Sequence, residues 1–170
     1  MTAFVALLRA VNVGGTGKLP MTALVRMCEA AGFASVQTYI ASGNAVFSSP
    51  DTEADVKARL EQALRDYAGK PVGVLVRTAA EMDAVLAGNP FPEAAAKWTV
   101  AIFLDEPPPR DTLKTLSGQK NEAVRLGRRE IYVHYPEGMG ISKLKIPAAK
   151  AGTARNMNTI AKLAEMAAAI

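Results

Sequence analysis

The stretch that most constrains the fold is Val36-Gln-Thr-Tyr-Ile-Ala-Ser-Gly-Asn-Ala-Val-Phe47. Two short runs rich in β-branched and aromatic residues flank the pair Gly43-Asn44. Because glycine takes a positive φ without steric cost, this pattern predicts a β-hairpin with a two-residue type II′ turn at the pair. In the register that such a turn sets, Ile40 faces Phe47 across the two strands. The hairpin concerns architecture and leaves the function open.

The residues before the hairpin predict a buried strand and a helix. Residues 3–10 are almost continuously apolar, which is typical of a strand buried on both faces of its sheet. A glycine-rich loop over residues 12–20 follows. Pro20 can begin a helix over residues 21–31, and Gly32 can end it.

After the hairpin, the sequence predicts a second helix and a fourth strand. Asp51 or Thr52 can cap a helix that runs to Tyr67, and residues 71–77 form a β-rich run after Gly69. The order β-α-β-β-α-β is that of the ferredoxin-like, split β-α-β arrangement. Such a unit covers one face of its sheet with helices, so we expect the rest of the chain to cover the second face of the apolar first strand.

The second half repeats most of this order. Its expected elements are a capped helix over 78–87 with Thr78 and Glu81 as a capping box, a strand over 98–104, a short helix over 110–116, a hairpin of 122–126 with 130–135, and a final helix over 154–169. We therefore predict an α+β fold of two ferredoxin-like halves, 1–78 and 79–170. The sheets are mainly antiparallel, the halves pack as one compact unit, and the second half lacks a final strand.

Composition is that of a globular protein. Of 170 residues, 49% are hydrophobic and 21% are charged, which suffices for a core without a metal or disulfide staple. Cys28 is the single cysteine, and no apolar run approaches the roughly 18 residues of a membrane span. We expect a cytoplasmic protein with no membrane partner. One cysteine and one histidine, His134, give no metal-ligand set and no cofactor signature.

The charge is unevenly distributed. The net charge is +4, yet residues 110–170 hold 11 Lys or Arg against 5 Asp or Glu, and no acid lies between Glu137 and Glu165. Such asymmetry favours an anionic partner, although a solvated basic face would give the same pattern.

Two short motifs resemble known functional motifs, a phosphate loop and a serine nucleophile motif, but both are incomplete. Gly14-Gly15-Thr16-Gly17-Lys18 resembles a phosphate loop, but Asn12 and Leu19 stand where a Walker A loop needs glycine and Ser or Thr. A tight strand-to-helix connection is the better interpretation. The sequence Ser142-Lys-Leu-Lys145 matches Ser-x-x-Lys, without the motifs that accompany it in penicillin-binding proteins.

The start of the final helix is the more interesting candidate. Thr153 can cap it, which would place Arg155, Asn156 and Asn158 in its first turns, where free amides and the helix dipole favour an anion. Asparagine is a poor helix former, so these residues either bond a neighbouring loop or bind a ligand directly.

Four ordered motifs make the chain resemble an uncharacterised bacterial family, domain of unknown function 1697. They are Ala6-Leu-Leu-Arg-Ala-Val-Asn-Val-Gly-Gly15, Thr38-Tyr-Ile-Ala-Ser-Gly-Asn-Ala-Val-Phe47, Gly140-Ile-Ser-Lys-Leu144 and Ala154-Arg-Asn-Met-Asn-Thr159. The resemblance implies two ferredoxin-like halves and no known activity. Family members usually carry tryptophan where this chain has Met157, so a stacking role there is not implied.

These observations support one leading hypothesis and two alternatives. The leading one is a module that binds an anionic ligand between its halves: a nucleotide, a phosphorylated metabolite or a nucleic-acid backbone. The alternatives are a small-molecule enzyme that uses the glycine-rich loop, the start of the final helix and Ser142 or Tyr39, and a structural homo-oligomer. The candidate ligand-binding residues are Arg9, Asn12, Gly14, Gly15, Lys143, Lys145, Arg155 and Asn156.

Overall fold

A computed structural model describes residues 1–9, 19–40 and 43–170. These residues form an α+β fold with antiparallel sheets, as predicted. Both sheets have four strands, whereas we expected the second to lack one. The chain divides into two compact units, one of Met1–Met82 with Lys162–Ile170 and the other of Asp83–Ala161. The boundary that we placed between residues 78 and 79 stays a prediction.

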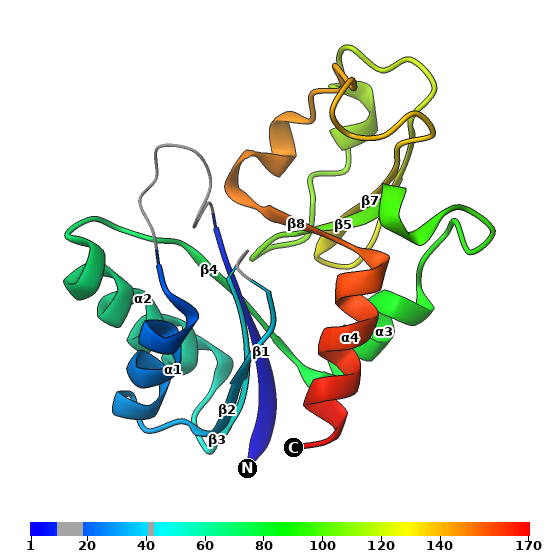
Figure 1. Ribbon diagram of the computed structural model, residues 1–170. Coiled ribbons are helices and arrows are strands. Elements are labelled where there is room, and N and C mark those ends of the chain that lie inside the picture. The colour runs from blue at the N-terminus through cyan, green and yellow to red at the C-terminus, as the bar shows by residue number, and fades with distance from the viewer. Residues whose placement is uncertain (10–18, 41–42) are drawn as a thin grey trace. The chain divides into compact units, whose positions relative to one another are not determined.

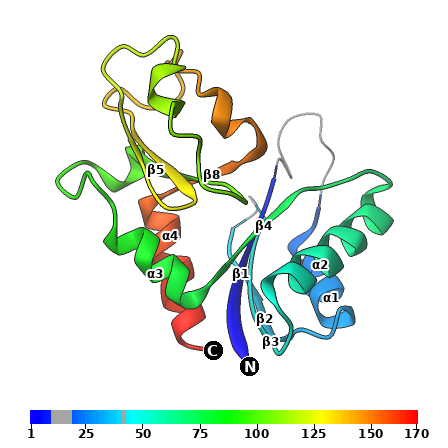
Figure 2. The same ribbon diagram turned by 180° about the vertical axis from the view of Figure 1, so that it is seen from behind.

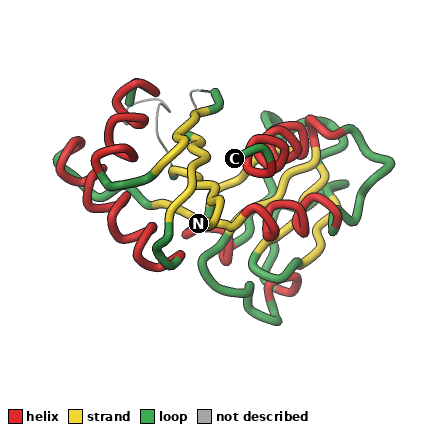
Figure 3. The backbone as a smooth tube through the Cα atoms, turned by 90° about the horizontal axis from the view of Figure 1, so that it is seen from below, coloured by secondary structure: helices red, strands yellow, loops and turns green. Residues whose placement is uncertain are grey.

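The first unit has the predicted element order. Its elements are β1 (Thr2–Leu8), α1 (Met21–Ala30), β2 (Ala34–Thr38), β3 (Asn44–Ser49), α2 (Glu53–Ala68) and β4 (Val74–Thr78). The strands lie in the order β2-β3-β1-β4, so the first strand is central (Figure 1). Helices α1 and α2 form one layer beside these strands (Figure 3). This is the element order of a ferredoxin-like unit.

Strand β1 is buried on both faces, which confirms its prediction. Phe4 and Leu8 belong to the core that α1 and α2 cover. On the opposite face, Val5 and Leu7 are also fully buried. Phe47 of β3 belongs to the same core as Phe4 and Leu8. The apolar side chains of β1 are therefore buried on both faces of the sheet.

The capping residues expected for helix α2 are found in the structure. The side chain of Thr52 accepts a hydrogen bond from the Asp55 amide at 3.2 Å and caps α2. Gly69, with φ +73°, follows its last turn. In α1, burial raises the pKa of the Cys28 thiol to about 12, as expected for a small core side chain rather than a reactive one.

The predicted register of the first hairpin is wrong. Thr38 pairs with Ala45, whereas the predicted turn places Ser42 opposite Ala45. The Tyr39 amide donates to the Asn44 carbonyl at 3.1 Å, and residues 41 and 42 of the predicted hairpin lie outside the described residues. Gly43 does take a positive φ, +89°, but Ile40 does so too, at +52°, and its side chain is 49% exposed. The Asn44 side chain donates to the Tyr39 carbonyl at 2.8 Å, which adds to the pairing of these two residues.

The sheet of the second unit has its strands in an order that corresponds to that of the first sheet. Its elements are the end of α3 (Ala79–Ala87), η1 (Ala96–Trp98), β5 (Thr99–Phe103), η2 (Thr112–Lys114), β6 (Ala123–Leu126), β7 (Glu130–His134), η3 (Pro147–Ala151), β8 (Thr153–Asn156) and the start of α4 (Met157–Ala168). The sheet order is β6-β7-β5-β8. Thr78 and Glu81 form the predicted capping box of α3.

The two faces of this second sheet are covered differently. Val100, Ile131 and Val133 form a core with residues of η3, such as Ala148. The backbone of η3 is drawn in orange in Figure 2. On the opposite face, the Tyr132 hydroxyl donates to the Val85 carbonyl of α3 at 2.8 Å. The candidate site described below lies at the edge of the first of these faces.

Three expectations for the second half are wrong. Residues 153–156 form strand β8, antiparallel to β5, so this half does have a final strand, and α4 begins at Met157. Asn156, not Thr153, caps α4, because its side-chain oxygen accepts from the Thr159 amide at 2.9 Å. The helix expected over 110–116 is a single 3₁₀ turn, η2.

Within the described residues, no helix combines the length and the apolar character that crossing a membrane requires.

The cap of α4 gives a first test. Replacing Asn156 with Ala should lower the free energy of unfolding by about 1 kcal/mol, whereas Asp or Ser at this position should retain most of it. Asn158→Ala is the matched control, since Asn158 is exposed inside the helix and Ala is the better helix former. Denaturant unfolding measures both. Equal effects of the two alanine variants would contradict the capping role.

Candidate functional site

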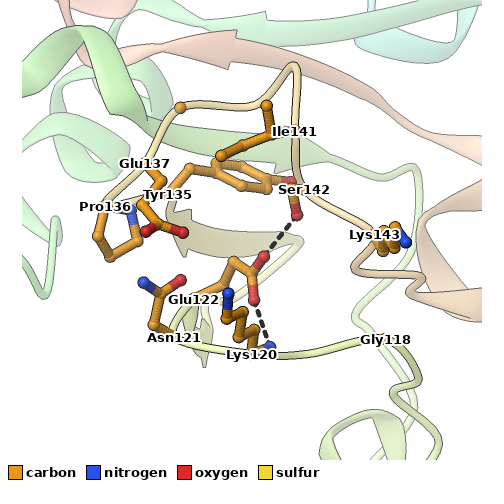
Figure 4. Close-up of a pocket in the computed structure, with 11 residues that line it drawn as sticks. Gly118, Lys120, Asn121, Glu122, Tyr135, Pro136, Glu137, Ile141, Ser142 and Lys143 are labelled. Carbon is orange, nitrogen blue, oxygen red and sulfur yellow. Dashed lines mark hydrogen bonds between the residues drawn. The ribbon is translucent and has the colours of Figure 1, made fainter.

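A pocket of about 210 Å³ lies in the second unit, between the segments 118–122 and 135–143 (Figure 4). Most of the side chains that line it are polar or charged, and they include Lys120, Asn121, Glu122, Tyr135, Glu137, Ser142 and Lys143. A concavity with convergent polar groups is the usual setting of a ligand site.

A larger hollow in the first unit lacks this character. It has a volume of about 610 Å³, is open, and runs along α1 and α2. Alanines and Met27 supply much of its lining, and Arg59, at its edge, is engaged by Asp51 at 2.9 Å. We therefore take the smaller, polar pocket as the candidate site.

The β6–β7 hairpin places the two central residues of the pocket. Ala123 pairs with His134 and Val124 pairs with Val133. Continuing this register by one step sets Glu122 opposite Tyr135 at the open end of the hairpin. Glu122 has the side-chain orientation of Val124, which belongs to the core face, and Glu122 is only 7% exposed.

Hydrogen bonds satisfy the carboxylate of Glu122. The Ser142 hydroxyl donates to Oε2 at 2.6 Å, and the Lys120 amide donates to Oε1 at 2.7 Å. The Ser142 hydroxyl, followed by backbone amides, lowers the pKa of Glu122 below its ordinary value. Glu122 is therefore an anion at neutral pH and holds both walls of the pocket (Figure 4).

Tyr135 lies beside this anion. Burial, and secondly the charge of Glu122, raise the pKa of its phenol. The ring is therefore neutral across the physiological range and presents an aromatic wall to the pocket.

Close backbone approaches fix the two segments. Ser117 and Lys145 exchange two backbone hydrogen bonds, at 3.1 and 2.8 Å. Gly118, with φ +68°, lies so close that a Cβ there would overlap the Lys143 carbonyl. On the other wall, Gly138 packs against the ring of Trp98. The walls therefore have fixed positions.

The pair of Ser142 and Glu122 suits binding better than nucleophilic catalysis. A general base works best when its pKa lies near the working pH. The lowered pKa of Glu122 makes it a weaker base than an ordinary glutamate at neutral pH. The Ser-x-x-Lys motif gains no support either, because Lys145 is exposed and contributes backbone pairing to Ser117.

The predicted site residues of the first half are described only in part. Arg9 is half-buried after β1, and its amide donates to the Gly73 carbonyl at 2.9 Å. Asn12, Gly14 and Gly15 lie outside the described residues. The ligand-binding roles of these residues stay predictions.

The other predicted residues lie in the second unit. Lys143 lines the pocket, and Lys145 follows it on the same exposed stretch. Arg155 is 8% exposed in β8, where burial lowers the pKa of its guanidinium to about 10. It donates to the Thr153 hydroxyl and to the Ala154 carbonyl, both at 2.9 Å, and Asn156 caps α4. Their roles toward a ligand stay predictions.

His134 contacts the neighbouring strand. The Thr99 hydroxyl donates its single proton to the Ala95 carbonyl at 3.0 Å and lies 3.2 Å from Nδ1 of His134. These contacts join His134 to the neighbouring strand β5 and are those of a structural histidine. Among the described residues, no group of three or more Cys, His, Asp or Glu could hold a metal ion.

The sequence predicts the hairpin that carries part of the pocket, but it does not predict the contact that closes the pocket. The hairpin predicted over 122–126 and 130–135 has Glu122 and Tyr135 as its outermost pair, and this pairing could have been inferred from the sequence. The return of Ser142 to Glu122 could not, because it depends on a loop whose path is set by contacts with Ser117 and Gly118.

Fold and site together define an α+β protein with two four-stranded antiparallel sheets and a polar pocket in its second unit. The chain belongs to the family described as "Protein of unknown function (DUF1697)", whose profile matches residues 1–132. This confirms the resemblance seen in the sequence. The fold is similar to that of the conserved bacterial protein SP0830 from Streptococcus pneumoniae, with a TM-score of 0.81 and 25% identity over 98% of both chains. No curated protein matches the chain.

Gly118 tests the close approach of the two walls. Gly118→Ala and Gly138→Ala both place alanine at a positive φ, which costs roughly 1–2 kcal/mol. Only at Gly118 would the new Cβ meet backbone, whereas at Gly138 it would lie 3.4 Å from Trp98. We therefore expect Gly118→Ala to lose about 1–3 kcal/mol more in denaturant unfolding. Equal losses would contradict the described approach.

Ser142 tests the electrostatics of Glu122. Because its pKa is lowered in the folded protein, Glu122 stabilises the fold above its unfolded pKa, and this contribution is lost as the pH falls through the folded value. In Ser142→Ala, we expect the pKa of Glu122 to rise toward its ordinary 4.5, measured by NMR titration of the carboxyl carbon. Ser117→Ala, which removes a hydroxyl from the neighbouring segment, should leave it unchanged. A pKa of Glu122 that is the same in Ser142→Ala as in the unaltered protein would refute the assigned cause.

Proposed function

We propose that this protein is a binding module for a small polar molecule that carries an anionic group, a phosphate or a carboxylate, and that the ligand occupies the pocket around Glu122 and Ser142. Two lysine side chains on the walls of this one pocket, Lys120 and Lys143, carry the proposal.

The ammonium groups of these lysines are available to a ligand. In the part of the chain that the structure describes, neither Lys120 nor Lys143 forms an ion pair or a hydrogen bond through its ammonium. They also lie in the basic part of the chain, where residues 110–170 hold 11 basic against 5 acidic residues. A positive surface potential favours the approach of an anion.

The size of the pocket favours a small metabolite. Sites for drug-sized ligands usually have volumes of about 300–1,000 Å³. At about 210 Å³, this pocket is below that range. A phosphorylated or carboxylated small molecule therefore suits it better than a whole nucleotide or a nucleic-acid backbone.

The walls of the pocket favour binding because they are held in place before a ligand arrives. The 2.6 Å hydrogen bond between Ser142 and Glu122 and the pairing of Ser117 with Lys145 join the two segments. A preorganised site avoids the entropic cost of ordering loops when the ligand binds.

Inorganic phosphate provides the direct test. Titrated at low ionic strength into the isotope-labelled protein, it should shift amide NMR signals of residues 118–122 and 135–143. Lys120→Ala and Lys143→Ala should each weaken binding by about fivefold, since a partly exposed ion pair contributes up to about 1 kcal/mol.

Lys114→Ala is the matched control, because Lys114 is an exposed lysine of η2 outside the pocket lining. It changes the net charge by the same amount and should leave the affinity within twofold. Absence of shifts in the two segments, or an equal loss in all three variants, would refute a site at this pocket.

A further inference from the structure

We propose that the ligand of this pocket is a small zwitterion, whose primary ammonium lies near Glu137 and Tyr135 and whose phosphate or carboxylate lies near Lys143. This inference rests on the proposed function and specifies its ligand class.

The charges that line the pocket are balanced. Two lysines, Lys120 and Lys143, are matched by two glutamates, Glu122 and Glu137. Tyr135 adds no charge, because its pKa is raised. A simple anion would gain from the lysines and be repelled by the carboxylates, whereas a ligand with both charges can gain from each.

The two glutamates differ in what they can offer. Glu122 is engaged by the Ser142 hydroxyl and the Lys120 amide, and it supplies a fixed negative charge. Glu137 is exposed, and within the described residues its carboxylate has no ion pair or hydrogen bond. Glu137 is therefore the carboxylate that a ligand can contact directly.

One pair of opposite charges, Glu137 and Lys143, lies at different ends of the pocket, and Lys120 and Glu122 lie between them. In the view of Figure 4, Glu137 and Asn121 are on the side of Tyr135, and Lys143 lies beyond Ser142 from them. An ammonium at the first end would meet a carboxylate and an aromatic ring, whose π-system attracts cations. The anion at the other end would meet the Lys143 ammonium.

This separation and the volume of about 210 Å³ define the class of ligand. It is a short-chain amine whose ammonium and anionic group are separated by a few bonds, as in a phosphorylated amino alcohol or an ω-amino acid. Two pairs of probes represent these sources: aminoethyl phosphate with ethyl phosphate, and 4-aminobutyrate with butyrate. Within each pair, the molecules differ in the amine.

The experiment measures the affinity of all four probes by calorimetry or NMR titration. In at least one pair, the amine-bearing molecule should bind about fivefold tighter or more, and the pair that shows this preference identifies the anionic group. In Glu137→Gln, the preference should fall to within twofold, while the molecule without an amine should bind as well as before or better. Glu106→Gln, an exposed acid of the same unit outside the pocket lining, should retain the preference.

The outcomes separate this inference from the proposed function. If ethyl phosphate or butyrate binds as tightly as its amine-bearing partner and depends on Lys143, the pocket binds anions and the zwitterion inference is wrong. If the amine preference persists in Glu137→Gln, the assignment to Glu137 is wrong. If no probe shifts the signals of the two segments, both proposals are refuted.

Discussion

The second unit depends on a buried carboxylate that must be hydrogen-bonded. Glu122 lies at the open end of the β6–β7 hairpin on the core face, where an unsatisfied charge would be strongly destabilising. The Ser142 hydroxyl and the Lys120 amide satisfy it, and in doing so they hold two loops that have no regular secondary structure of their own. The pocket exists because these loops are held there. Its shape is thus a consequence of the requirement to pair one buried anion.

The predictions that the structure confirms concern features decided by neighbours in the sequence. The continuous apolar run of β1 determines its burial whatever covers it. The cap at Thr52 and the capping box of Thr78 and Glu81 join residues only three positions apart. The β6–β7 hairpin is also local, and its short connection fixes the register that brings Glu122 opposite Tyr135. The pairing of Glu122 with Tyr135 at the centre of the site could therefore be predicted from the sequence.

The wrong predictions concern segments whose residues suit two local structures about equally well. Gly43-Asn44 can form a two-residue turn, but the Asn44 side chain donates to the Tyr39 carbonyl and Thr38 pairs with Ala45, which is a different register. Residues 153–156 carry a plausible helix start, yet pairing with β5 makes them a strand, and Asn156 then begins the helix. The position of Ser142 beside Glu122 was not predicted at all, because a contact between residues 20 positions apart in the chain sets it.

The same distinction applies to charge. The excess of basic residues over 110–170 is a property of the whole half, and it suggests an anionic partner. Salt screens exposed charges over about 8–10 Å, so distant lysines guide the approach of a ligand but contribute little to its selection once it is bound. Selection falls to the groups within the pocket, and there two glutamates accompany the two lysines. A local charge balance inside a basic half favours a ligand that is attracted by its anionic group and held by both of its charges.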